Sequence, residues 1–187
     1  MAQKKKDWNG LISGFKASDL VFLDESGCNT DMTRRYAYSL GGSRAVDSAP
    51  LSKPKNTTIL SSIQLDGTLR YTTFSGGTTV ERFKRYLETD LLPHLNGNSV
   101  LIMDNMKSHH AKPVKNLLDS SEIRYIYLPP YSPDLNPIEK LWSKVKAFLR
   151  KFKARTLDAL PNAIQNAFHS VTISDCSGWF RFCGYAL

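Results

Sequence analysis

Short apolar runs along the chain predict β-strands. Residues 20–24 (LVFLD) and 99–104 (SVLIMD) are continuous apolar runs that end in an aspartate, a pattern typical of strands buried on both faces. Residues 57–74 hold two β-like runs around Asp66-Gly67, a pair that predicts a hairpin. With a further apolar run at 123–130, these segments predict a sheet that contains both a hairpin and separate buried strands.

Apolar residues that recur with the period of a helix predict the other elements. The predicted helices begin near Thr78, cover 111–121, extend from Asn136 to about Lys153, and extend from Thr156 to about His169. Strands that alternate with helices run parallel, whereas a hairpin adds antiparallel strands. The pattern therefore predicts an α/β fold with a mixed sheet and helices packed on its faces.

Charge points to a polyanionic partner. The chain has 187 residues and a formal net charge of +8, with a sequence pI near 9.4. Part of the excess is local, because Lys and Arg gather at 140–155 (KLWSKVKAFLRKFKAR). The length suits one domain. Residues 1–18, which include the lysine run 4–6, are expected to be a disordered or linker segment; a DNA-contacting arm is the alternative.

Several classes of protein are excluded by what the sequence lacks. No run of about eighteen apolar residues exists to span a membrane, and no apolar core follows the N-terminal lysines as in a secretory signal. The Gly-Gly pairs at 41–42 and 76–77 lack the Gly-Lys-Ser/Thr of a phosphate-binding loop. Three cysteines without a Cys-x-x-Cys pair predict reduced thiols in the cytoplasm rather than disulfides or a zinc site.

The aspartates at the ends of two apolar strands are the first candidates for chemistry. Ligand sites gather at the carboxyl ends of parallel strands, so Asp24 and Asp104 would meet if their strands are parallel neighbours. Two close carboxylates repel each other, and a divalent cation such as Mg²⁺ or Mn²⁺ would neutralise them. The alternative is that each aspartate only caps a turn.

Glu139 is the candidate for a third carboxylate. It follows residues 128–137 (LPPYSPDLNP), in which four prolines stiffen the backbone ahead of a helix. Asn136 suits the N-cap and Pro137 the first helical position, which places Glu139 in the first turn, where the helix dipole favours its charge. Asn136 and Glu139 also have the spacing of a capping box, in which Glu139 would only bond to the backbone. Tyr131 is expected to pack within this connection.

The helix that follows carries a basic face. Glu139, Ser143, Lys146 and Arg150 share one face at the helical period, beside a buried stripe that includes Trp142. Basic side chains in such a row can follow the phosphates of a nucleic acid. A solvated charged flank is the alternative.

Three motifs resemble those of the catalytic domain of the mariner-superfamily transposases, in particular their bacterial insertion-sequence branch. The motifs are VFLDESG (21–27), LIMDNMKSHH (101–110) and LPPYSPDLNPIEKLWSKVK (128–146), and the resemblance extends from about Asp19 to His169. The 34 residues between Asp104 and Glu139 (105–138) are a spacing characteristic of the family's Asp–Asp–Glu triad.

The resemblance implies a ribonuclease H-like fold over residues 19–187, a mixed five-stranded sheet with helices on both faces. It implies that Asp24, Asp104 and Glu139 are catalytic and bind Mg²⁺, as two ions, with Mn²⁺ as a substitute. The polar residues expected around this triad are Glu25, Asn105 and Asn136. The candidate DNA contacts are Lys107, His109, Lys146 and Arg150. Two alternatives are that His109 or His110 orients the site, and that either has only a surface or helix-capping role.

The implied activity is DNA transposition: cleavage at transposon ends, then attack of the freed 3′-hydroxyl on target DNA, both by in-line displacement at phosphorus. The implied partners are DNA and a second copy of the chain, in a bacterial nucleoid. The family's N-terminal helix-turn-helix region is expected to be absent. Three explanations are open: a split reading frame with a separate helix-turn-helix-bearing polypeptide, a truncated copy, or a catalytic fragment. Residues 34–44 (RRYAYSLGGSR) differ from the family's Gly-Trp-rich version. Two alternatives are a catalytically silent fragment that binds DNA or protein, and a ribonuclease H-like nuclease or resolvase.

Overall fold

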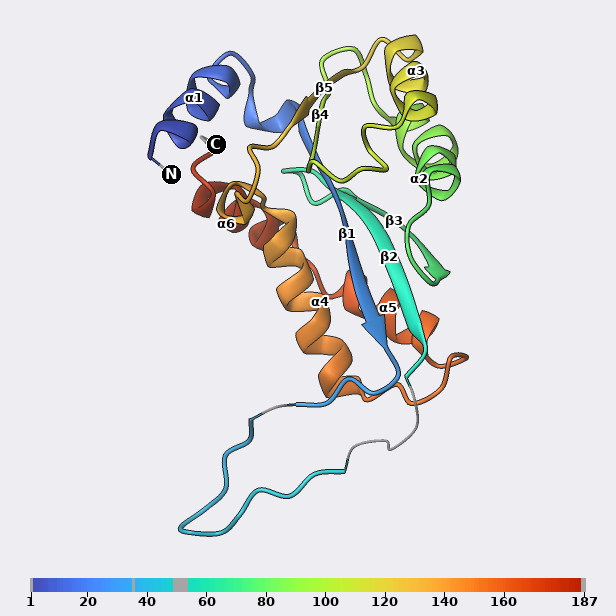
Figure 1. Ribbon diagram of the computed structural model, residues 1–187. Helices are drawn as coiled ribbons and strands as arrows, with labels where there is room; N and C mark the ends of the chain where they lie inside the picture. Colours follow the sequence, from blue (N-terminus) through green and yellow to red (C-terminus); the bar gives the residue numbers. More distant parts are fainter. Residues whose placement is uncertain (1, 35, 49–53, 186–187) are drawn as a thin grey trace.

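The fold is a five-stranded mixed sheet with helices on both faces (Figure 1). The computed structural model describes residues 2–34, 36–48 and 54–185. The strands are β1 (Leu20–Asn29), β2 (Asn56–Ile63), β3 (Leu69–Ser75), β4 (Val100–Met103) and β5 (Arg124–Tyr127). The helices are α1 (Ala2–Ile12), α2 (Val80–Tyr86), α3 (Lys112–Ser120), α4 (Ile138–Phe152), α5 (Leu160–His169) and α6 (Ile173–Phe182). Shorter helical turns lie at Ala17–Asp19, Leu87–Leu91, Leu92–His94 and Pro133–Leu135.

The order of strands in the sheet is β3-β2-β1-β4-β5. β1, β2 and β3 pair antiparallel, whereas β1 with β4 and β4 with β5 pair parallel. The predicted hairpin joins β2 to β3, and its Gly67 has a φ of 90°, a conformation that favours glycine. The predicted mixed sheet is therefore confirmed.

Each face of the sheet packs against its own set of helices. On one face, Phe22, Ile59 and Ile102 join a core formed with α1, α4, α5 and α6. On the other face, Leu23 and Leu101 pack against α2, α3 and the turn that follows α2. Because alternate side chains of a strand point to opposite faces, the continuous apolar runs supply both cores. No helix in the described ranges is both long and apolar enough to cross a membrane.

The two ends of the chain differ from the predictions. Much of the segment expected to be disordered or a linker is helix α1, and its Trp8 and Ile12 are buried in the core. Helix α6, which was not predicted, begins with a capping box between Thr172 and Asp175. Figure 1 shows α1 and α6 on the same side of the sheet, close to both ends of the chain.

The proline-rich connection leads from β5 to α4 along the edge where the parallel strands end. The Leu128 amide donates to the Met103 carbonyl at 2.9 Å, which ties the start of the connection to the end of β4. Tyr131 has a φ of 58° and is 98% exposed, so the prediction that it packs within the connection is wrong. Helix α4 then begins at Ile138, one residue after Pro137, the predicted first helical position.

Candidate active site

Parallel pairing places Asp24 and Asp104 at adjacent positions of neighbouring strands. Leu23 pairs with Met103 at the end of β4, and the next residue on each chain segment is an aspartate. β1 continues to Asn29 beside β2, so the prediction that Asp24 ends its strand is wrong. The predicted parallel pairing of the two strands is confirmed.

Glu139 approaches the same place from the first turn of α4. All three carboxylates line one cavity of about 420 Å³, together with Asn105, Asn136 and the proline-rich connection. The start of α4 has no side-chain cap bond, so the capping-box alternative for Glu139 is not realised. The buried Oδ1 of Asn136 has no hydrogen-bond partner among the described residues. A polar ligand in the cavity would satisfy this atom.

Asp24 is held by a residue that sequence analysis placed only in the buried stripe of α4. The Trp142 indole Nε1 donates to Asp24 Oδ2 at 3.0 Å. Burial raises the pKa of Asp24 to about 7, and the Glu25 and Glu139 carboxylates raise it further against the effect of the Trp142 bond. Trp142 lies three residues after Glu139, a spacing that puts both on one side of a helix and could have indicated this role.

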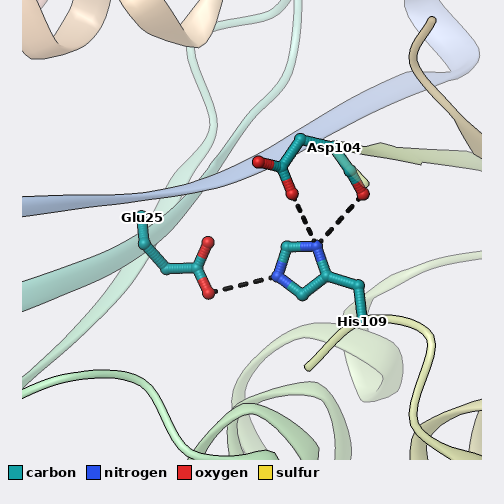
Figure 2. A group of neighbouring side chains, drawn as sticks. All are labelled: Glu25, Asp104 and His109. Atoms are coloured by element: carbon teal, nitrogen blue, oxygen red, sulfur yellow. Dashed lines mark hydrogen bonds and ion pairs between the residues drawn. The ribbon is translucent and has the colours of Figure 1, made fainter. Parts of the chain in front are cut away.

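His109 lies between Asp104 and Glu25, as Figure 2 shows. Its Nδ1 is 2.9 Å from Asp104 Oδ1 and its Nε2 is 3.1 Å from Glu25 Oε1. The ring stacks on Phe83 with centroids 4.1 Å apart and is fully buried. Since both carboxylates accept hydrogen bonds, each ring nitrogen carries a proton and the imidazole is a buried cation. His109 is therefore not on the surface, and the prediction that it contacts DNA is wrong; the alternative, that it orients the site, fits this position.

The buried cation shifts the titration of its neighbours. Burial lowers the pKa of His109, but hydrogen bonds and charge from Asp104 and Glu25 outweigh it and raise the pKa to about 9. Burial also raises the pKa of Asp104, yet hydrogen bonds from His109 and the Met106 amide leave it below its ordinary value. The two aspartates therefore differ near neutral pH: Asp104 is charged, whereas Asp24 is protonated in a substantial fraction of the molecules.

The other predicted residues have different places. Asn105 lines the cavity, and its side-chain amide donates to the Leu128 carbonyl. Lys146 and Arg150 do not line the triad cavity. They line a separate polar cavity, together with residues from the end of β1 and the segment after it (27–29 and 31–33). Lys107 is exposed on the loop after β4.

Comparison with known proteins decides the family. Residues 19–161 match the family described as DDE superfamily endonuclease. The chain belongs to this family. The prediction of a mariner-superfamily catalytic domain is confirmed by the match and by the relatives described below.

The relatives of this DDE family member are transposases. It is 28% identical to the transposable element Tc1 transposase of Caenorhabditis elegans over 97 residues, which are 50% of this chain and 36% of that protein. The fold matches the Mos1 transposase in a paired-end complex with the left transposon end, with a TM-score of 0.78 at 18% identity, over 96% of this chain and 56% of that one.

The catalytic domain of Mos1 mariner transposase solved alone gives a TM-score of 0.69 at 17% identity, over 96% of this chain and 85% of that one. The ribonuclease H-like fold class is thereby confirmed. The chain spans little more than half of the longer Mos1 chain and about a third of the Tc1 transposase.

Proposed function

We propose that the chain is the catalytic domain of a DNA transposase and that Asp24, Asp104 and Glu139 are its catalytic residues. The observation that carries the proposal is that three carboxylates, from β1, the end of β4 and the first turn of α4, line one cavity. Carboxylates collected from distant parts of a chain repel one another unless a cation or a proton neutralises them. Transposition, and the DNA on which it acts, are parts of this proposal.

The residues at the cavity fit divalent metal ions. The donors are carboxylate oxygens and the unpartnered Oδ1 of Asn136, an all-oxygen set that suits Mg²⁺ or Mn²⁺. His109 is excluded as a ligand, because Asp104 and Glu25 occupy both of its ring nitrogens. Bound at the triad, two such ions would activate a water or a 3′-hydroxyl and stabilise the leaving oxygen of a phosphodiester.

Neighbouring side chains hold the triad in place. Trp142 fixes one oxygen of Asp24, and His109 with the Met106 amide fixes one oxygen of Asp104. Both aspartates also line the cavity, where a ligand can reach them. Glu25 balances the charge of His109 on the other side of the imidazole ring. Preorganised ligands of this kind limit the positional errors that metal-assisted catalysis cannot tolerate.

DNA is the substrate that the surface favours. Lys146 and Arg150 line a polar cavity that is formed with the end of β1, and Lys107 is exposed on the loop after β4. These three cations are proposed to bind phosphates, which predicts binding that weakens steeply with salt. We also propose that two copies act together on the two transposon ends, and that a helix-turn-helix-bearing polypeptide supplies end recognition.

A cleavage assay tests the proposal. Linear duplex DNA carrying a transposon end is incubated with Mn²⁺ or Mg²⁺ and wild-type protein, Asp24→Asn, Asp104→Asn or Glu139→Gln. Asp158→Asn, a change at an exposed acid outside the cavity, is the matched control. We expect metal-dependent cleavage by the wild type and the control and none by the three triad variants. Cleavage that survives all three changes refutes the assignment.

A panel of substrates separates the related nucleases. A four-way junction and an RNA–DNA hybrid are offered beside the linear duplex under the same conditions. Preference for the linear duplex supports a transposase, whereas preference for the junction or the hybrid indicates a resolvase or a ribonuclease. Binding without cleavage at any metal concentration indicates a silent fragment.

A further inference from the structure

A second and larger cavity of about 690 Å³ lies along α4 and shares no residue with the triad cavity. Its lining residues include Lys144, Phe148 and Lys151 of α4, Ser170 after α5, and Arg34 and Tyr36 of the segment that follows β1. We call it the α4 pocket. Its volume is within the range of pockets that bind small organic molecules, and it admits a ligand the size of a nucleotide.

The positive charge of the α4 pocket favours a negatively charged ligand. None of the described residues that line it is acidic, and Arg150 adds a fourth cation. Lys144 is neutralised by an ion pair with Asp175 at 2.5 Å. Arg34, Arg150 and Lys151 form no ion pair within the described part of the chain. Three unpaired cations around one hollow create a positive potential that attracts a negative ligand.

The aromatic residues of the pocket favour a ligand with a flat ring that can stack on them. The Phe148 ring is half-buried and is fixed by the core and by the parallel ring of Phe152, with centroids 6.1 Å apart. Tyr36 is 91% exposed, so one face or more of its ring is available to a ligand. Aromatic rings beside unpaired cations are the combination with which proteins bind single nucleic acid strands, by stacking on bases and pairing with phosphates.

The segment that carries Arg34 and Tyr36 is anchored to the end of α4. The Arg155 guanidinium donates to the carbonyls of Met32 at 3.2 Å and Thr30 at 3.5 Å, and Lys153 pairs with Asp47 on the returning limb. The described parts of this segment extend past the C-terminal end of α4 (Figure 1). The anchoring holds the near limb beside α4, where the pocket lies.

We propose that the α4 pocket binds an unpaired nucleotide of a DNA strand, with its base on Tyr36 and Phe148 and its phosphate on Arg34 and Lys151. Arg150 also lines the polar cavity that contains Lys146, so a strand bound there continues into the α4 pocket. The identity of the polymer as DNA rests on the proposed function. The recognition of an unstacked base does not depend on the triad.

The test measures binding of a single-stranded oligonucleotide that carries one 2-aminopurine. The fluorescence of the 2-aminopurine reports binding, in EDTA and at low salt. Tyr36→Ala is expected to weaken binding about five- to tenfold, in the range found for the loss of one base–aromatic stack. Tyr38→Ala is the matched control, because Tyr38, two residues away, is also fully exposed to solvent and does not line the pocket. Lys151→Gln should weaken binding and reduce its salt dependence, whereas Lys55→Gln should do neither.

The outcomes separate this inference from the proposed function. Equal effects of Tyr36→Ala and Tyr38→Ala overturn the pocket assignment, even if cleavage depends on metal and on the triad. Loss of self-association by Tyr36→Ala, seen by sedimentation without a change in oligonucleotide binding, also overturns it, because the pocket then holds protein. Tyr36-dependent binding without any metal-dependent cleavage supports the pocket and removes the nuclease proposal.

Discussion

At the scale of single residues, each aspartate of the triad has one oxygen fixed by a donor from the protein. Trp142 donates to Asp24 Oδ2 at 3.0 Å, and the Met106 amide donates to Asp104 Oδ1 at 3.0 Å beside His109. The two aspartates nevertheless differ in charge, because Asp24 is partly buried and no cation among the described residues pairs with it, whereas Asp104 pairs with His109. This difference has consequences for stability that can be measured without metal.

Asp24→Asn should stabilise the metal-free protein, and increasingly so from pH 4 to pH 7. The pKa of Asp24 is about 7 in the folded protein against an ordinary 3.8. Between these values the folded protein binds a proton that the unfolded chain has lost, so wild-type stability falls as pH rises. The variant should gain on the order of 1–3 kcal/mol at pH 7 and little at pH 4. Urea unfolding in EDTA measures both.

The range of that experiment ends at pH 7 because His109 titrates above it. The pKa of His109 is about 9 in the folded protein against 6.5 ordinarily, so its own contribution is lost between these values in both proteins. Asp158→Asn controls for a change of net charge. A pH-independent gain for Asp24→Asn would contradict the raised pKa.

His109→Leu should destabilise the metal-free protein by about 3 kcal/mol, because it leaves Glu25 and Asp104 without the buried cation between them. The loss should be smaller in a Glu25→Gln background, where one of the two charges is already absent. Urea unfolding of the four proteins in a double-mutant cycle gives the coupling. An equal loss in both backgrounds would show that Glu25 is not a charge partner of His109.

At the scale of elements, the features that were predicted correctly are those encoded in short segments of the chain. Three such features were predicted: the strands from the apolar runs of β1 and β4, the hairpin between β2 and β3, and the stiff proline-rich connection before α4. In each case the residues of the segment themselves favour the backbone conformation. The burial of His109 depends on Glu25, which lies 84 residues earlier. The role of Trp142 depends on Asp24, 118 residues away. No local pattern specifies such contacts. The strand ends and the proline-rich connection indicated the triad as candidates, and the family resemblance supplied the parallel pairing that brings the two aspartates together.

The connection from β5 to α4 stores strain at Tyr131. A left-handed backbone costs a residue with a side chain roughly 1–2 kcal/mol, and the exposed Tyr131 ring makes no packing contact to offset it. Tyr131→Gly should therefore leave stability unchanged or raise it by up to about 1 kcal/mol, since glycine also loses more entropy on folding. Tyr131 lines the triad cavity, so the same change should lower DNA cleavage.

Thermal unfolding measures the effect of Tyr131→Gly on stability, and the cleavage assay measures its effect on activity. Tyr38→Gly is the control for stability, because Tyr38 is exposed but does not have a positive φ. Stability that falls by more than in Tyr38→Gly would show that the Tyr131 ring holds the connection in place. Unchanged cleavage would show that the strain serves no purpose at the cavity.

At the scale of the whole molecule, the two ends of the chain meet behind the candidate active site. The Trp8 indole of α1 donates to the Tyr185 hydroxyl at 3.2 Å, and that hydroxyl donates to the Leu135 carbonyl at 2.5 Å. Trp8 and Tyr185 are 177 residues apart. Helix α1 is therefore stabilised by contacts that its own sequence does not reveal, which explains why the segment read as a disordered start.

Tyr185→Phe tests whether this junction supports the site. It leaves two buried groups, the Trp8 N–H and the Leu135 carbonyl, without their partner, which costs about 1–3 kcal/mol for each group. Leu135 ends the turn that precedes Asn136 and α4. We therefore expect amides in the first turn of α4 to exchange faster with deuterium and cleavage to fall, although Tyr185 does not line the cavity.

Tyr125→Phe is the matched control for Tyr185→Phe, because the Tyr125 hydroxyl donates to Asp119 at 2.9 Å in an exposed pair. Its loss should change stability by less than about 1 kcal/mol and leave α4 unaffected. If Tyr185→Phe loses stability uniformly and the first turn of α4 exchanges no faster, the ends of the chain only stabilise the domain. Local exchange at 136–139 beyond the global loss would mean that the carboxylate of Glu139 is positioned from both ends of the chain.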